Sequence, residues 1–140
     1  MNSVHYSSNS DEWETPQDFF NYWYNIFKFD IDVCASKENA KLDVYYDKSC
    51  NGLIKPWHGT AWCNPPYSNV KEWVLKAYRE KLLGVTTVML IPARTDTKIW
   101  HDVIFPHAKV EFIKGRLKFS NSKNSAPFPS AIVIFYGAKQ

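Results

Sequence analysis

The sequence lacks several features that mark well-defined protein classes. Its three cysteines, Cys34, Cys50 and Cys63, form no Cys-x-x-Cys pair, and their spacing from His58 suits no common zinc site. An odd number of cysteines without a secretory leader indicates reduced thiols rather than a disulfide framework. No apolar run approaches the roughly 20 residues that span a bilayer. We therefore expect a cytoplasmic protein with no membrane partner and no bound metal.

A large excess of charge is also missing. The chain has 17 basic and 14 acidic residues, a net charge of +3. This permits a positive patch for phosphate but does not require a nucleic-acid partner. Aromatic residues, by contrast, are abundant, and core packing is their most common role. No linker or repeat divides the 140 residues, which predicts a flexible tail at residues 1–12 and a single domain at residues 13–140.

The first elements are predicted from capping and periodicity. Thr15 is expected to cap a helix with Pro16 at its first position. Apolar residues then recur at helical spacing, namely Phe19, Phe20, Trp23, Ile26 and Phe27. Residues 29–35 alternate and are β-branched, which favours a strand. Residues 36–59 are irregular, with turn signals at Asn51-Gly52 and Pro56.

Strands and helices continue to alternate after residue 59. Strands are expected at residues 60–63, 85–91, 109–114 and 130–136, and a short helix at residues 97–105. A longer helix follows a cap at Ser68 or Asn69, and its apolar face comprises Val70, Trp73, Val74, Ala77, Tyr78 and Leu82. Residues 115–129 are polar and loop-like. The pattern predicts an α/β fold, a mainly parallel sheet with helices on both faces.

One motif carries a specific chemistry. Asn64-Pro65-Pro66-Tyr67 directly follows a predicted strand, at the edge where open α/β sheets bind ligands. The Asn64 oxygen and the Pro65 carbonyl are acceptors for the two hydrogens of an amino group attached to a π-system, such as adenine N6. The Tyr67 ring is a surface on which a base could stack. The alternative is a stiff turn without chemistry.

Five blocks in order extend this interpretation over nearly the whole chain. They are Asp11-Glu12-Trp13-Glu14-Thr15-Pro16, Asp32-Val33-Cys34-Ala35, Trp62-Cys63-Asn64-Pro65-Pro66-Tyr67, Pro92-Ala93-Arg94-Thr95-Asp96-Thr97, and Gly115-Arg116-Leu117-Lys118-Phe119 with Ala126-Pro127-Phe128-Pro129-Ser130. With these blocks the chain resembles the phage-type Dam family of DNA N6-adenine methyltransferases. The resemblance implies a compact Rossmann-like fold, S-adenosyl-L-methionine as methyl donor, double-stranded DNA as partner, and the cytoplasm of a bacterial or phage-infected cell.

The resemblance also implies a set of site residues. The catalytic motif is Asn64, Pro65, Pro66 and Tyr67, and the cofactor-binding set is Trp13, Thr15, Pro16, Asp32, Cys34, Ala35, Asp47 and Asn64. The helix N-terminus at residues 15–18 could bind the cofactor carboxylate, and Asp32 its ammonium.

Other parts of the cofactor site stay open. Asp43 and Asp47 are both candidates for the ribose hydroxyls. Cys34-Ala35-Ser36 stands where larger methyltransferases carry Gly-x-Gly, so small side chains would allow close approach. Asn51 stands where this family often has Asp before Gly-Leu, so its contact with the cofactor adenine would lack charge.

Contacts with DNA are expected from four basic residues, Arg94, Arg116, Lys118 and Lys123. Arg94 could equally pair with Asp96, and residues 115–129 could equally be a solvated loop. No large inserted target-recognition domain is present. This predicts a short target, loose specificity or help from a second protomer in a homodimer.

The function expected from the sequence is site-specific methylation of adenine N6 in DNA. Two alternatives remain. The acceptor could be another conjugated amino group, on cytosine N4, RNA adenine or protein glutamine, or the chain could be a DNA-binding module without activity.

Overall fold

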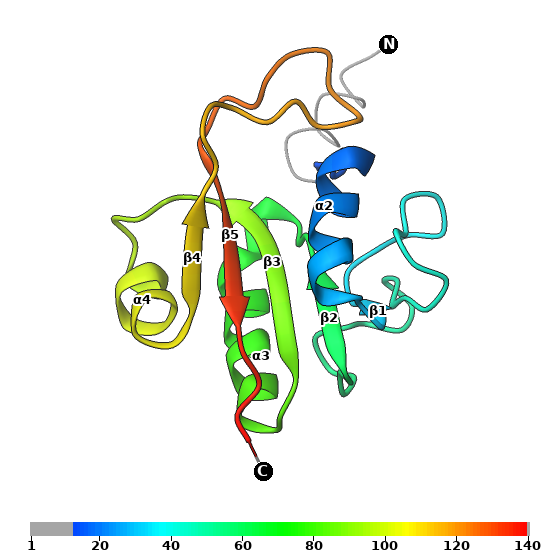
Figure 1. The fold of residues 1–140 in the computed structure, drawn as a ribbon, viewed down its shortest axis with the longest axis vertical. Helices are drawn as coiled ribbons and strands as arrows, with labels where there is room; N and C mark the ends of the chain where they lie inside the picture. Colours follow the sequence, from blue (N-terminus) through cyan, green and yellow to red (C-terminus); the bar gives the residue numbers. More distant parts are fainter. Residues whose placement is uncertain (1–12, 140) are drawn as a thin grey trace.

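The computed structural model describes residues 13–139; the tail predicted at residues 1–12 lies outside them. A five-stranded sheet in the order β1-β2-β3-β5-β4 forms the centre (Figure 1). β1 (Ile31–Asp32), β2 (Thr60–Cys63) and β3 (Thr86–Pro92) are parallel neighbours. β5 (Ser130–Phe135) runs antiparallel to β3 and to the edge strand β4 (Lys109–Phe112).

The sheet is therefore mixed, and the prediction of a mainly parallel sheet was wrong in its pairings. β4 and β5 are joined by residues 113–129, which contain no helix that could carry the chain back across the sheet. A connection of this kind returns the chain in the opposite direction and gives an antiparallel pair. The predicted α/β class is compatible with the architecture.

Helices cover both faces of the sheet, as the sequence predicted. α2 (Gln17–Phe27) packs Phe20 and Trp23 on one face, in front of the sheet in Figure 1. α3 (Val70–Leu82) packs on the other face together with a π-helical segment, η2 (Trp100–Ile104), which runs into the short α4 (Phe105–His107). A 3-10 turn, η1 (Tyr67–Asn69), precedes α3.

Alternate strand residues supply the two layers of the core. On β3, Val88 and Leu90 belong to the α2 side, whereas Met89 and Ile91 belong to the α3 side. All four are fully buried, as is typical of a central strand covered on both faces. Trp100 and Cys63 are also core residues, 1% and 0% exposed.

Three local predictions were wrong. Thr15 does not cap α2, because Pro16 occupies the N-cap position and the Thr15 hydroxyl has another partner. Ile26 and Leu82, predicted on buried helix faces, are 55% and 52% exposed; both lie within two residues of a helix end. β1 is only two residues long instead of spanning residues 29–35, because the chain leaves the sheet at Val33.

The topology places the functional segments along one edge of the sheet. β1, β2 and β3 end toward the same edge, and the start of α2 lies there too (Figure 1). The segment of residues 115–129, orange in Figure 1, extends beyond the end of β4 at this edge. Ligands bind at this edge in open α/β sheets.

Candidate active site

A cavity of about 670 Å³ lies where β1 and β2 end, within the size range of small-molecule sites. It brings together most of the predicted site, namely Trp13, Thr15, Asp32, Cys34, Ala35, Asp47, Asn64, Pro65 and Pro66. Pro16 and Tyr67 do not line it. The structure thus gathers segments that are far apart in the sequence around one space.

The side-chain amide of Asn64 is held in a fixed orientation. Its Nδ2 donates to the main-chain carbonyl of Trp13 and, at 3.0 Å, to Thr15 Oγ1. A carbonyl oxygen can only accept a hydrogen bond, so the reversed amide would place two oxygens against each other. Asn64 Oδ1 must therefore point away from the Trp13 carbonyl.

Asn64 Oδ1 is buried and has no hydrogen-bond partner among the described residues. An unpaired buried acceptor costs about 1–3 kcal/mol, and such an atom in a native protein calls for an explanation. A ligand that donates an N–H at this point would remove the cost. The Asn64 amide is thus oriented to accept a hydrogen bond at the predicted catalytic motif.

The segment that orients Asn64 is itself anchored to residues 115–129. The backbone N–H of Glu14 donates to Asn121 Oδ1 at 3.0 Å. The backbone N–H of Ser120 donates to the Glu14 carbonyl at 2.9 Å, and the indole of Trp13 packs on Phe119 and Phe128. This loop, predicted for DNA contact, therefore also supports the active-site amide.

Tyr67 is packed in the core. Its side chain is 6% exposed, and its hydroxyl donates to the Leu90 carbonyl at 3.5 Å. Phe119 and Phe128 pack edge-on against its ring, and burial raises the pKa of the phenol well above its usual value. The ring is therefore almost fully covered, and Tyr67 lines a second, smaller cavity instead of the large one.

Asp32 is a buried carboxylate at the end of β1. It is 3% exposed and accepts backbone N–H bonds from Lys41 at 3.0 Å and Cys34 at 3.4 Å. Burial raises the pKa of its carboxyl to about 7, although both hydrogen bonds oppose the shift. A cationic ligand group would stabilise the ionised form.

The structure distinguishes between the two acidic residues predicted to bind the ribose hydroxyls. Asp47 lines the cavity, whereas Asp43 does not and is exposed. Hydrogen bonds from Ser49 and Cys50 lower the pKa of the Asp47 carboxyl. The geometry favours Asp47 as the residue available to a ligand in the cavity.

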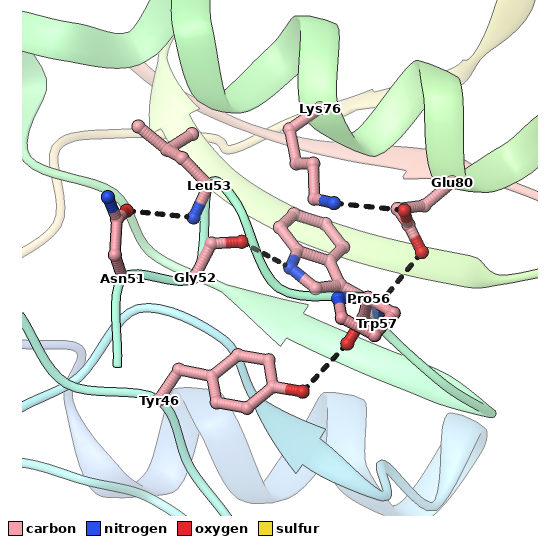
Figure 2. A network of polar contacts seen from close by, with 8 residues as sticks. All are labelled: Tyr46, Asn51, Gly52, Leu53, Pro56, Trp57, Lys76 and Glu80. Carbon is pink, nitrogen blue, oxygen red and sulfur yellow. Dashed lines mark hydrogen bonds and ion pairs between the residues drawn. The ribbon is translucent and has the colours of Figure 1, made fainter. Parts of the chain in front are cut away.

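A buried polar network supports the wall made by Asn51 and Gly52 (Figure 2). Trp57 Nε1 donates to the Gly52 carbonyl at 2.8 Å, and the Trp57 backbone N–H donates to Glu80 Oε1 at 2.9 Å. Glu80 is paired with Lys76 at 3.0 Å, and the Lys76 ammonium lies 5.7 Å from the Trp57 ring centre. α3 thereby holds the cavity wall in place.

Gly52 fills a position with no room for a side chain. A Cβ at this residue would lie 2.2 Å from the Val33 carbonyl and 3.0 Å from the Trp73 ring. Asn51 has a left-handed backbone with φ of 57°, and its Oδ1 accepts from the Leu53 N–H. The Asn51 oxygen is thus already used, which leaves its NH₂ group as the part able to meet a ligand.

Comparison with known proteins decides the family. A family model described as DNA N-6-adenine-methyltransferase (Dam) matches residues 2–136. The chain belongs to this family. It is 37% identical over 140 residues to the DNA N-6-adenine-methyltransferase of Haemophilus phage HP1 (strain HP1c1), covering 91% of this chain and 80% of the relative. A second relative is the DNA N-6-adenine-methyltransferase of Escherichia phage T1, 35% identical over 91 residues, 62% of this chain and 38% of that protein.

The basic residues of this Dam family chain do not form one group. Arg94 lines a second cavity of about 310 Å³ beside Tyr67, together with Lys71 and Lys98. Arg116, Lys118 and Lys123 lie on the exposed loop of residues 115–129 and line neither cavity. The Arg116 guanidinium donates to the Ala126 carbonyl at 3.5 Å. The predicted contacts of these four residues with DNA stay predictions.

Several residues that shape this Dam family site were missed by the sequence reasoning. They are Glu14, Lys41, Tyr46 and Trp73, which line the cavity, and Trp57, Lys76 and Glu80, which support its wall. Only the spacing of Lys76 and Glu80, one helical turn apart, was a usable sequence signal. The others depend on contacts across the chain.

Two further findings concern residues 13–139. No group of three His, Cys, Asp or Glu side chains there could hold a metal ion, and none of the three cysteines forms a disulfide bond. Within the same range, no helix has the length and apolar character required to cross a membrane.

Proposed function

We propose that this chain is a DNA adenine-N6 methyltransferase that uses S-adenosyl-L-methionine. The observation that carries the proposal is the buried, unpaired Oδ1 of Asn64, in an amide whose orientation is fixed by Trp13 and Thr15. Family membership and the names of both phage relatives support adenine N6 as the acceptor.

The motif would act on N6 through hydrogen bonds rather than through a strong base. The lone pair of N6 is delocalised into the adenine ring, which makes it a poor nucleophile. Asn64 Oδ1 and the Pro65 carbonyl each accept one N6 hydrogen, and this favours a tetrahedral nitrogen with a localised lone pair. Because the amide is already oriented, little reorganisation accompanies the reaction.

The residues of the large cavity fit the proposed donor. When bound, S-adenosyl-L-methionine supplies an electrophilic methyl group on a sulfonium. Asp32 would bind its ammonium, Asp47 its ribose hydroxyls, and Asn51 its adenine; Cys34 and Ala35 would allow close approach. In this proposal residues 13–140 form one compact, Rossmann-like catalytic domain.

A flipped-out adenine would reach Asn64 and Pro65 from the side of Tyr67. In this proposal the base enters on the side of Phe119 and Phe128, which pack against the Tyr67 ring, so target binding would be coupled to a change in residues 115–129. Arg94, Arg116, Lys118 and Lys123 would contact DNA phosphates. A homodimer would supply recognition that an inserted domain provides in larger enzymes.

The test is to remove the acceptor at Asn64. Asn64→Ala should lose nearly all methyl transfer to DNA, at least about a hundredfold, and should retain binding of S-adenosylhomocysteine in calorimetry. Asn69→Ala is the matched control, because Asn69 makes no side-chain cap bond at α3 and its loss should leave the rate unchanged.

The same assay separates the alternatives. Radiolabelled methyl transfer is compared on DNA, RNA and protein extract, and modified DNA is sequenced for N6-methyladenine. A wild-type rate in Asn64→Ala would remove the basis of the proposal. Radiolabel found only in RNA or only in protein would assign a different methyl acceptor. Absence of cofactor binding would indicate a module without activity.

A further inference from the structure

Two residues of opposite charge line the cavity. Asp32 and Lys41 both line it, and the backbone N–H of Lys41 donates to Asp32 Oδ2 at 3.0 Å. Lys41 is partly buried, whereas Lys37 and Lys48, the other two lysines of the cavity, are exposed. The pair Asp32 and Lys41 matches the two charges of a free amino acid.

The Lys41 ammonium is positioned by the first turn of α2. Its Nζ donates to Gln17 Oε1 at 3.1 Å. The amide of Gln17 is oriented in turn, because Gln17 Nε2 donates to Asn21 Oδ1 at 2.8 Å. An ammonium has three donors, and this single bond leaves others for a ligand.

The N-terminus of α2, which the sequence predicted to bind the cofactor carboxylate, does not face the cavity as Lys41 does. Of residues 15–18, only Thr15 lines the cavity, and Pro16 has no N–H to offer. The backbone amides at the start of α2 therefore do not open into this space. Lys41 is the partly buried cation that does line it.

The surroundings of Lys41 favour an anionic partner. Burial lowers the pKa of its ammonium, and the charges of Glu14 and Asp32 oppose the shift. Neither carboxylate forms an ion pair with Nζ within 4 Å among the described residues. A ligand carboxylate beside Nζ would compensate the lost hydration directly.

We propose that Lys41 binds the carboxylate of the cofactor's amino-acid end, opposite the ammonium bound by Asp32. This rests on the proposed function, since it takes S-adenosyl-L-methionine as the ligand. It assigns Lys41 as a binding residue, outside the five sequence blocks that carried the family resemblance.

The experiment uses three ligands that carry different charged groups. S-adenosylmethionine carries the ammonium and the carboxylate, decarboxylated S-adenosylmethionine lacks the carboxylate, and 5′-methylthioadenosine lacks the whole amino-acid group and the sulfonium charge. Calorimetry gives their affinities for the full-length wild type, Lys41→Met, Lys41→Arg and the matched control Lys37→Met. Circular dichroism and thermal melts compare the folding of each variant.

Lys41→Met should weaken S-adenosylmethionine about tenfold and leave the other two ligands unchanged. Lys41→Arg should restore much of the difference, and Lys37→Met should change no affinity more than about twofold. Asp32→Asn should weaken both ligands that carry an ammonium.

Two outcomes would overturn the assignment. One is an unchanged affinity of Lys41→Met for S-adenosylmethionine, and the other is an equal loss for the carboxylated and decarboxylated ligands. Failure of the wild type to bind S-adenosylmethionine is a different result, which would refute the proposed function and the assignment with it.

Discussion

At the scale of single residues, burial raises the pKa of Asp32, and this determines how stability and cofactor binding should depend on pH. Its carboxyl has a pKa raised from 3.8 to about 7 because the side chain is desolvated. Between pH 3.8 and about pH 7, Asp32 therefore keeps its proton in the ligand-free folded state, whereas it has lost the proton in the unfolded chain. The contribution of Asp32 to the free energy of unfolding is therefore fully present below pH 3.8 and is lost as the pH rises toward 7.

Cofactor affinity should depend on pH in the opposite sense. Only the ionised Asp32 attracts an ammonium, so the affinity for S-adenosylhomocysteine should rise about tenfold per pH unit below about pH 7. The ligand amino group stays protonated over this range. Calorimetry from about pH 5 to pH 7 measures the slope. Asp32→Asn should bind more weakly with a much flatter profile, and a flat profile in the wild type would contradict the prediction.

At this scale, the sequence predicted the positions of residues that lie at the ends of strands. Asn64 follows the end of a strand, and Asp32 ends another, so their meeting at one edge could be predicted. The role of Lys41 could not, because it depends on the path of the irregular residues 33–59. The burial of Tyr67 was missed for a similar reason, since Phe128 covers it from 61 positions later in the chain.

At the scale of elements, an ion pair on α3 supports the site, although neither of its two residues lines the cavity. Glu80 and Lys76 side chains are only 6% and 9% exposed. Glu80 also accepts the Trp57 N–H, so one carboxylate satisfies a cation and a backbone donor. The helix thus fixes the segment that carries Gly52.

Glu80→Ala should destabilise the protein by about 3–5 kcal/mol, because it leaves a buried ammonium and a buried N–H without a partner. The double variant Lys76→Met, Glu80→Gln is the matched control, since it removes both charges and keeps an acceptor for Trp57. It should lose much less stability. Urea unfolding measures both, and equal losses would contradict an effect of the unpaired charge.

The boundaries of elements were predicted unevenly, for physical reasons. β2 and β5 were placed within a residue, because their apolar runs are buried on both sides. The start of α2 was shifted because the Thr15 hydroxyl bonds Asn64 instead of the helix. A capping pattern does not reveal that a tertiary partner has taken the capping oxygen.

At the scale of the whole molecule, the active-site amide depends on a loop from the far end of the chain. Asn121 accepts from Glu14, and the segment of Glu14 holds Asn64 through Trp13 and Thr15. The same loop carries Arg116, Lys118 and Lys123. In the proposed function, DNA contact and the orientation of the Asn64 amide therefore depend on the same loop.

Asn121→Ala should slow methyl transfer several-fold in single-turnover assays, because the loss of about 1 kcal/mol from a hydrogen bond loosens the Glu14 segment. Asn124→Ala, an exposed position of the same loop, is the control and should keep the wild-type rate. DNA affinity is measured for both variants. A slower rate that saturating DNA restores would show a binding effect and contradict the prediction.

The bond between Glu14 and Asn121 also sets an order of events during synthesis. Its two partners are 107 residues apart, which corresponds to roughly 5–20 s of translation at typical rates. In the second part of this interval, after residue 64 has been added, the nascent chain holds Asn64 and its motif, but the bond that anchors the Glu14 segment does not yet exist. The Asn64 amide can gain its final orientation only after Asn121 has left the ribosome and bound the Glu14 segment.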